Sequence, residues 1–383
     1  MIDIDFVATR QVLVGEGSIG QLPGTLKWHG KSNVMFIPYA GDAQAARDIV
    51  NSLEAAGCAV TVYAEVIKEP DLAVIDKGAK LCCEKGCDVV VALGGGSVID
   101  AAKTIAMIST NGGAAEDFQL NGREVKTPPL LFIAIPTTAG TGAEATKVSV
   151  VYNPQRGFKK AIYHTSMIAD VTILDPKTTV GLPPAVTAAT GADAITHAIE
   201  SYTSVFANDF SRMYSLKALQ LLADNIVAAY ENPNDLAARQ NMLLGSYFAG
   251  CAISAGTCLA HIVGQPLGAI FSIPHGDACS IFLIPSMELN REYALRDYVD
   301  VAKVLGIDAA GKTDDEIVTE GIAALRGIFA RINAPRRLTQ YVAAEDVDMP
   351  AVLDNIQTAM GHIKTNPRPV SRELFEEIIR MVM

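Results

Sequence analysis

Four residues in the second half of the chain have the types and spacing that a divalent metal site needs. Asp193 and His197 lie four residues apart in a run of helical character, so on a helix their side chains point the same way. A carboxylate and an imidazole on one face bind a divalent ion when further ligands reach them from elsewhere. His261 and His275 are the further candidates. For the first pair alone, an aspartate in a first helical turn and a hydrogen-bonded buried histidine are the alternative.

Helices must position these ligands. Pro183 and Pro184 stand where a helix can begin but cannot continue, so we expect a helix to start there and to carry Asp193 and His197. From about residue 181 strand-like runs stop, and alanine- and leucine-rich helical sequence dominates, as at 211–230, 235–256 and 314–332. We therefore predict two domains, 1–180 and 181–383, of which the second is all-helical.

The first half alternates between short apolar runs and helical runs. We expect strands within 2–14 and at 33–39, 58–63, 88–93 and 130–135, with helices at 42–56, at 71–86 and from Val98 onward. This β-α-β rhythm is typical of a parallel sheet that carries helices on both faces. The sequence therefore predicts an α/β fold for the first domain.

One of these strands runs directly into the glycine-rich segment Gly94-Gly95-Gly96-Ser97. Glycines at a strand-to-helix turn let a pyrophosphate approach the backbone, and the helix N-terminus offers free amide donors and the positive end of a dipole. The spacing differs from G-x-G-x-x-G, so a plain tight turn is the alternative. Ser97 and Asp100 equally fit a helix cap and an acidic residue in the first helical turn.

A second polar loop follows the next predicted strand. Hydroxyls and glycines are bunched in PTTAGTGAE at 136–144, where Thr137, Thr138 and Thr141 suit hydrogen bonding to a ribose, a phosphate or an amide. A solvated loop would explain this stretch alone. Two such loops after two strands of one sheet favour a nucleotide site.

The composition excludes several classes of protein. With 383 residues, half of them hydrophobic and 19% charged, the chain can bury a sizeable core. A net charge of −11 gives no field that favours nucleic acid or an anionic membrane, and no apolar stretch reaches a membrane span of about 20 residues. Seven cysteines show neither a paired framework nor zinc spacing with histidines, so we expect free thiols. With no signal peptide in Met1–Phe6, a cytoplasmic protein is expected.

Taken together, the ordered motifs resemble the iron-containing (group III) alcohol dehydrogenase family. The segments that carry the resemblance are GGGSVID at 94–100, PTTAGTGAE at 136–144, GLPP at 181–184 with GADAITHAIE at 191–200, and His261 with PLG at 266–268 and PHG at 274–276. NPRP at 366–369 also resembles the closing loop of that family. Order and spacing match along nearly the whole chain.

The resemblance implies a dehydroquinate synthase-like fold, in which an α/β nucleotide-binding domain precedes an all-helical metal-binding domain and the active site lies between them. Fe²⁺ would be held by Asp193, His197, His261 and His275, a set that Zn²⁺ also accepts. NAD(H) or NADP(H) would be bound by Gly94, Gly95, Gly96, Ser97, Asp100, Thr137, Thr138, Thr141 and Lys160. The metal would polarise an aldehyde oxygen while the nicotinamide delivers hydride, with alcohol oxidation as the reverse. We also expect a homodimer or larger homo-oligomer.

Three departures from the family pattern bear on substrate and cofactor. Gln265 stands where many relatives carry a second histidine, and a glutamine cannot relay a proton but can shape a substrate pocket. Tyr39 stands where NAD-preferring relatives place an aspartate, which leaves NADP open. The loop at 68–71 lacks the usual Asn-Pro pattern. A zinc polyol dehydrogenase, a dehydroquinate synthase-like enzyme and a non-catalytic metal- or nucleotide-binding scaffold are the rival interpretations.

Overall fold

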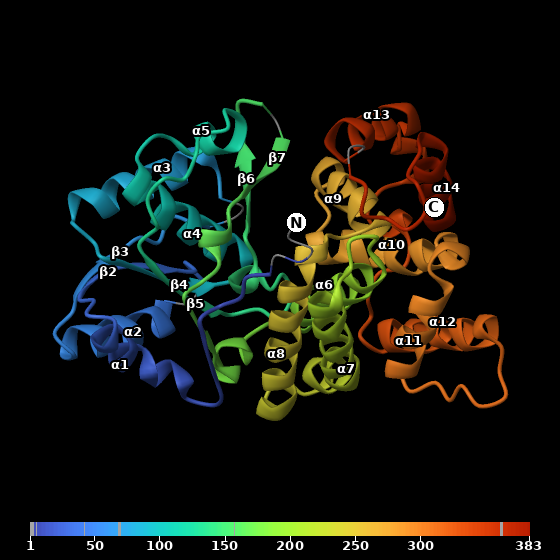
Figure 1. Ribbon diagram of the computed structural model, residues 1–383, viewed down its shortest axis with the longest axis horizontal. Helices are drawn as coiled ribbons and strands as arrows, with labels where there is room; N and C mark the ends of the chain where they lie inside the picture. The colour runs from blue at the N-terminus through green and yellow to red at the C-terminus, as the bar shows by residue number, and fades with distance from the viewer. Residues whose placement is uncertain (1–3, 5, 42, 68–69, 157, 361–362) are drawn as a thin grey trace. The chain divides into compact units, whose positions relative to one another are not determined.

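The structure is a computed structural model that describes residues 4, 6–41, 43–67, 70–156, 158–360 and 363–383 (Figure 1). The chain forms two compact units. One contains Asp5–Thr138 and Gly142–Thr179, and the other contains Val180–Met383 with Ala139–Thr141 and Ile4. Of the loop at 68–71, residues 68 and 69 lie outside the described residues.

The first unit is built on a parallel sheet of six strands in the order β1-β8-β5-β4-β2-β3. In that order the strands are Gln11–Val14, Val171–Leu174, Leu131–Pro136, Val89–Gly94, Asn33–Pro38 and Ala59–Val62. Their connections include α1 (Leu22–Trp28), α2 (Ala43–Ala55), α3 (Leu72–Glu84) and α4 (Gly96–Asn111). The predicted parallel α/β sheet is confirmed.

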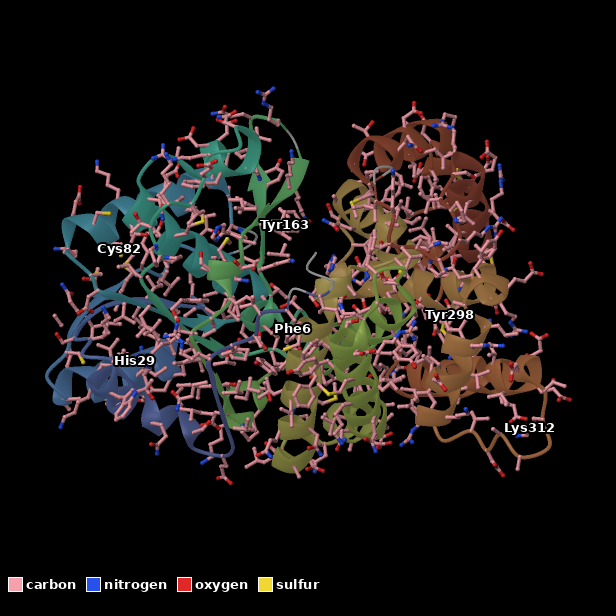
Figure 2. All side chains as sticks on the ribbon, viewed as in Figure 1. Phe6, His29, Cys82, Tyr163, Tyr298 and Lys312 are labelled. Atoms are coloured by element: carbon pink, nitrogen blue, oxygen red, sulfur yellow. The ribbon has the colours of Figure 1, made fainter. Side chains whose placement is uncertain are left out.

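Alternating residues of the strands pack against opposite layers of helices. Val34 and Phe36 of β2 belong to a buried cluster with Leu26 of α1 and Leu53 of α2. Their neighbours on β2, Met35 and Ile37, belong to a second cluster that contains residues of α3 and α4, among them Cys82, which Figure 2 labels. Burial on both faces explains why these strands read as continuous apolar runs in the sequence.

Some elements of this unit differ from the sequence-based expectation. α4 begins at Gly96 rather than at Val98, and its N-cap is Gly95, so Ser97 does not cap the helix. β6 (Val148–Asn153) and β7 (Phe158–Tyr163) form an antiparallel pair outside the main sheet that the sequence analysis did not predict. β8, which has only four residues, and α5 (Ala115–Leu120) were likewise not expected from the sequence.

The described part of the second unit contains helices and no strand. They are α6 (Pro184–Thr203), α7 (Asp209–Glu231), α8 (Leu236–Ala252), α9 (Leu259–Phe271), α10 (His275–Leu289), α11 (Leu295–Val304), α12 (Asp314–Arg331), α13 (Met349–Met360) and α14 (Arg372–Val382). The expected helix start is confirmed, because Pro183 is the N-cap of α6 and Pro184 its first residue. Among the described residues no single helix is long and apolar enough to cross a membrane, although one pair bent by 105°, Leu236–Ala255 with Leu259–Phe271, passes that test of length and composition.

Candidate functional site

Helix α6 presents three polar side chains to one buried region. Asp193, His197 and Glu200 are spaced i, i+4 and i+7, so they line one face of the helix, and each residue is at most 5% exposed. Buried polar side chains need hydrogen-bond partners or a bound ion. The groups that face them come from α9 and α10, which both belong to the same unit as α6.

Two glycines allow these helices to approach closely. A Cβ atom at Gly264 of α9 would lie 2.8 Å from the carbonyl oxygen of Ala278 and 2.9 Å from the Cα atom of Cys279, both in α10. A Cβ atom at Gly276, in the first turn of α10, would overlap the carbonyl oxygen of Ala189 in α6. The backbone of α10 is therefore packed directly against both neighbours, which fixes where its first-turn side chains lie.

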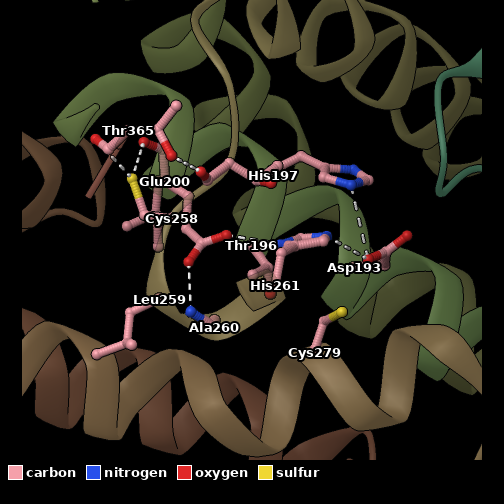
Figure 3. A network of polar contacts seen from close by, with 12 residues as sticks. Asp193, Thr196, His197, Glu200, Cys258, Leu259, Ala260, His261, Cys279 and Thr365 are labelled. Atoms are coloured by element: carbon pink, nitrogen blue, oxygen red, sulfur yellow. Dashed lines mark hydrogen bonds and ion pairs between the residues drawn. The ribbon is translucent and has the colours of Figure 1, made fainter. Parts of the chain in front are cut away.

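All four predicted metal ligands meet at one oxygen atom of Asp193. Its Oδ1 lies 3.4 Å from Nε2 of His261, 3.7 Å from Nε2 of His275 and 3.8 Å from Nε2 of His197. The rings of His197 and His261 are stacked with their centroids 4.6 Å apart. Figure 3 shows both of these histidines directed toward Asp193. Residues more than 60 positions apart in the chain thus converge as the sequence predicted.

This cluster fits a divalent ion because its donor atoms lack partners. Oδ1 of Asp193, Nε2 of His261 and Nδ1 of His197 are buried and have no hydrogen-bond partner among the described residues. A buried acceptor left unpaired costs about 1–3 kcal/mol, and a carboxylate costs more. One carboxylate and three imidazoles match the ligands that Fe²⁺ and Zn²⁺ accept. A bound cation would satisfy Oδ1 of Asp193 and Nε2 of His261 together, while His197 faces Asp193 through its other nitrogen, Nε2.

Glu200 orients one of these histidines, a role that the sequence analysis missed. Its Oε2 accepts a hydrogen bond of 2.6 Å from Nδ1 of His261, and its Oε1 accepts one of 2.6 Å from the backbone N–H of Ala260 (Figure 3). With its proton on Nδ1, His261 has a bare Nε2 that faces Asp193, which is the tautomer a metal ligand needs. The i+7 spacing from Asp193 was the available signal.

Cys279 is a second residue that the sequence analysis missed. It lies four residues after His275 on α10, and one ligand atom each of Asp193, His261, His275 and Cys279 lies within 4.8 Å of the others. All seven cysteines are free thiols, as expected, and Cys279 is fully buried beside a carboxylate and two imidazoles. The i, i+4 spacing of His275 and Cys279 was the sequence signal for this position.

The electrostatics of the cluster act in both directions on the binding of a cation. Cys279 raises the pKa of His275 to about 9, and the pKa of His261 is raised as well, so these two imidazoles must lose a proton before they bind a metal. Burial lowers the pKa of His197 to about 4, so this imidazole is neutral at pH 7. Burial would raise the pKa of Asp193, but the neighbouring histidines lower it below its ordinary value. Burial would likewise raise the pKa of the Cys279 thiol, yet His261 and His275 lower it. A neutral imidazole and an ionised carboxylate are the forms that coordinate metals.

Gln265 follows His261 by one turn of α9 and is partly buried. Its side chain makes no hydrogen bond with any described residue. The alternative of a glutamine bonded to a nearby backbone carbonyl is therefore not what the structure shows. An unengaged amide one turn from the histidine cluster is available to a ligand, and its part in a substrate pocket stays a prediction.

In the first unit, three of the predicted cofactor segments follow adjacent strands. β4 pairs in parallel with β5, with Gly94 opposite Pro136, and Thr137 donates a hydrogen bond of 3.0 Å to the carbonyl of Gly94. Tyr39 follows β2 and donates one of 2.7 Å to the carbonyl of Leu93. The chain runs from β2 outward to β3 and then returns to β4 on the other side of β2, so these loops flank a topological switch point. Ligands of open α/β sheets bind at such points.

The other predicted cofactor residues have different surroundings. Asp100 accepts a hydrogen bond of 2.9 Å from the backbone N–H of Val150 and lies 3.5 Å from Nζ of the buried Lys103, which supports a structural role. Lys160 is an exposed residue of β7. Thr141 lies in the segment Ala139–Thr141 of the helical unit. The part of these three residues in cofactor binding stays a prediction.

Comparison with known proteins agrees with these observations along the whole chain. Residues 9–176 match the model of the iron-containing alcohol dehydrogenases, and residues 187–383 match that of the C-terminal region of the Fe-containing alcohol dehydrogenase family. The chain is 36% identical over 329 residues to the probable alcohol dehydrogenase EutG of Salmonella typhimurium, which covers 85% of this chain and 82% of that protein. It is 31% identical over 383 residues to the lactaldehyde reductase of Escherichia coli strain K12, with 97% and 99% covered.

Among solved structures, the fold is similar to that of a 1,3-propanediol oxidoreductase. The TM-score is 0.93 at 27% identity, and 99% of each chain is covered. The assignment to a family is unambiguous. Two family models together span most of the chain, and relatives are more than 30% identical over most of their length. The chain belongs to the iron-containing alcohol dehydrogenase family.

Proposed function

We propose that this member of the family is an iron-dependent, NAD(P)-linked reductase of a short polar aldehyde, and that it oxidises the corresponding primary alcohol in reverse. The observation that carries the proposal is the meeting of three histidines at Oδ1 of Asp193, where buried donor atoms lack partners. Unpaired buried ligand atoms favour a bound ion, because each of them destabilises the metal-free fold, and turnover separates an enzyme from a non-catalytic metal-binding scaffold.

In this proposal each residue of the cluster holds a defined position. Asp193, His197, His261 and His275 hold the ion, and Glu200 keeps the proton of His261 on Nδ1. The bound ion and the nicotinamide would supply, respectively, polarisation of the aldehyde oxygen and the hydride. Gln265 would orient the substrate, because its amide offers two donors and one acceptor to a hydroxyl or anionic group near the aldehyde.

For the cofactor, we propose that the pyrophosphate binds at the start of α4. Gly95 is the N-cap of this 16-residue helix and makes no side-chain capping bond, so the first backbone N–H groups are available to an anion. Thr137 and Thr138 follow the adjacent strand and supply hydroxyls. Tyr39 has no carboxylate to repel a 2′-phosphate, so we expect weak discrimination between NAD and NADP.

An aldehyde panel tests the reaction. Protein loaded anaerobically with Fe²⁺ should oxidise NADH or NADPH with short aldehydes that carry a hydroxyl or an anionic group. Metal analysis of the same sample separates iron from zinc. His261→Ala should lower metal occupancy and abolish turnover, because it removes a ligand. Full activity in protein that holds no metal would refute the proposal.

Gly95→Val tests the cofactor site. A Cβ atom at Gly95 would lie 3.3 Å from Oγ1 of Thr138, so a branched side chain would crowd the space between the two loops. We expect the affinity for NADH and NADPH to fall by about tenfold or more. Gly24→Val is the matched control, because no atom lies within 4 Å of a Cβ at this exposed helical glycine. Equal affinities in the two variants would contradict the assignment.

A further inference from the structure

Among the described residues, the Sγ atom of Cys279 is the one sulfur within the cluster of metal-binding groups. Its residue is fully buried, and its Sγ lies 3.8 Å from Nε2 and 3.9 Å from Nδ1 of His275. A buried free cysteine ordinarily acts as a small apolar side chain. Here, however, its neighbours are an unpaired carboxylate oxygen and an unpaired imidazole nitrogen rather than a hydrocarbon core.

The distances between these ligand atoms are close to those between the ligands of one metal ion. Bond lengths of about 2.0–2.3 Å to oxygen, nitrogen and sulfur place the ligands of such an ion roughly 3.3–3.6 Å apart. The observed distances are 3.4 Å between Asp193 and His261, 3.7 Å between Asp193 and His275, and 3.8 Å between His275 and Cys279. The other separations within the set are at most 4.8 Å, so side-chain rotations would bring the four ligand atoms around one ion.

The backbone holds the sulfur at this point. Cys279 lies on the first turns of α10, where its Cα atom packs against Gly264 of α9 and leaves no space for a Cβ atom there. Gly276 packs the same turn of α10 against α6. The backbone position of Cys279 is thus fixed by packing. The imidazole of His275, on the same face of α10, lies beside the thiol, as in metal sites built from i, i+4 pairs.

We propose that Cys279 is a ligand of the metal ion and binds it as a thiolate together with Asp193, His261 and His275. This inference rests on the proposed metal site. Coordination replaces the S–H bond with a sulfur–metal bond and releases one proton to water. Because thiolates favour softer ions, a sulfur donor shifts the preference of the site from Fe²⁺ toward Zn²⁺ and Cd²⁺. His197, whose Nε2 lies 3.8 Å from Oδ1 of Asp193, keeps its place in the proposed metal site, so the thiolate adds a ligand and does not displace an imidazole.

Cobalt substitution tests the proposal without reference to activity. Co²⁺ bound by a thiolate gives a sulfur-to-metal charge-transfer band in the near ultraviolet, whereas Co²⁺ bound by nitrogen and oxygen alone shows only its visible ligand-field bands. We expect the wild-type protein, loaded with Co²⁺ under anaerobic conditions, to show the charge-transfer band. Cys279→Ser should lose that band and retain the visible bands.

Cys82→Ser is the matched control, because it removes another buried thiol, from α3 of the other unit. This variant should keep the full spectrum of the wild type. The wild-type spectrum decides the question even if the Cys279 variant does not fold. Visible bands without the charge-transfer band would overturn the role of Cys279 and leave the proposed metal site intact. Failure of the wild type to bind Co²⁺ would overturn both.

Competition between metals gives an independent measure. The Kd for Cd²⁺ should rise by about tenfold or more in Cys279→Ser, while the Kd for Fe²⁺ changes less, because only the softer ion depends on sulfur. Equal changes for the two ions would show that the substitution disturbs the site without removing a ligand, and would overturn the proposal.

Discussion

Glu200→Gln should weaken metal binding without unfolding the protein. In the wild type both carboxylate oxygens accept hydrogen bonds, one from Ala260 and one from Nδ1 of His261. Glutamine can accept only through its carbonyl, which must face the backbone N–H of Ala260 because that donor cannot move. Its NH₂ group then faces His261, so Nδ1 must become an acceptor and the proton moves to Nε2.

The new tautomer blocks the nitrogen that faces the ligands. Nε2 lies 3.4 Å from Oδ1 of Asp193, so its proton is directed at that oxygen and must be displaced before a metal can bind. Loss of a partner that orients a metal ligand typically costs 10–100-fold in affinity, or about 1.4–2.7 kcal/mol. The metal-free protein should lose little stability, because the side chain at position 200 keeps a hydrogen bond to Ala260 and one to His261. Glu200→Ala should in addition lose about 1–3 kcal/mol, because the N–H of Ala260 is left without a partner.

Competition with a chromophoric chelator measures the Kd for Zn²⁺ or Fe²⁺, and thermal unfolding without metal measures stability. Glu144→Gln is a matched control, because this glutamate is also 2% exposed but belongs to the other unit. It should leave metal affinity unchanged. If Glu200→Gln binds metal as tightly as the wild type, the carboxylate does not set the tautomer of His261 and the reasoning fails.

Three further predictions concern separate parts of the chain. Tyr39→Asp should weaken the binding of NADPH by about tenfold relative to that of NADH, since a carboxylate repels a 2′-phosphate. An unchanged ratio of the two Kd values would show that another residue sets the selectivity. Gln265→Leu should raise KM about threefold or more for a hydroxylated aldehyde but not for propanal, and equal changes would remove Gln265 from the pocket. Burial raises the pKa of Glu144 from 4.5 to about 7, so the native state binds more protons in that window and stability should fall as pH rises through it. Glu144→Gln should flatten this decline in thermal unfolding at pH 5–7, and parallel curves would contradict the shift.

Much of the fold was predictable because buried strands and helices have recognisable patterns of apolar residues in the sequence. The apolar runs at 33–38 and 88–93 and the glycines after the second run indicated β2, β4 and the turn between β4 and α4. Elements without such patterns were missed. β8 has four residues, and although burial alternates along β6, two of its three buried residues are polar, Ser149 and Asn153. Short strands are defined by their partners in the sheet, which a single sequence does not reveal.

The cluster of candidate metal ligands was predictable, but the groups around it were not. Asp193 and His197 show their shared face through spacing, and motif order supplied His261 and His275. Which carboxylate orients a histidine depends on how α6 crosses α9, and which side chain lies beside His275 depends on how closely α10 packs. Glu200 and Cys279 therefore became functional candidates only when three helices were placed in space.

The close packing of α10 bears directly on the chemistry of the site. α6 contributes Asp193 and His197 through a spacing that any helix provides, whereas His275 and Cys279 reach the same point only because Gly264 and Gly276 admit the backbone of α10. A small displacement of α10 would move the imidazole and the thiol together, since both lie on its first turns. The oxygen of Asp193 and the nitrogen of His261 would remain in place, because Glu200 and α6 hold them. Metal selectivity is therefore expected to depend on the packing of α10, and the presence of a site at all on α6 and α9.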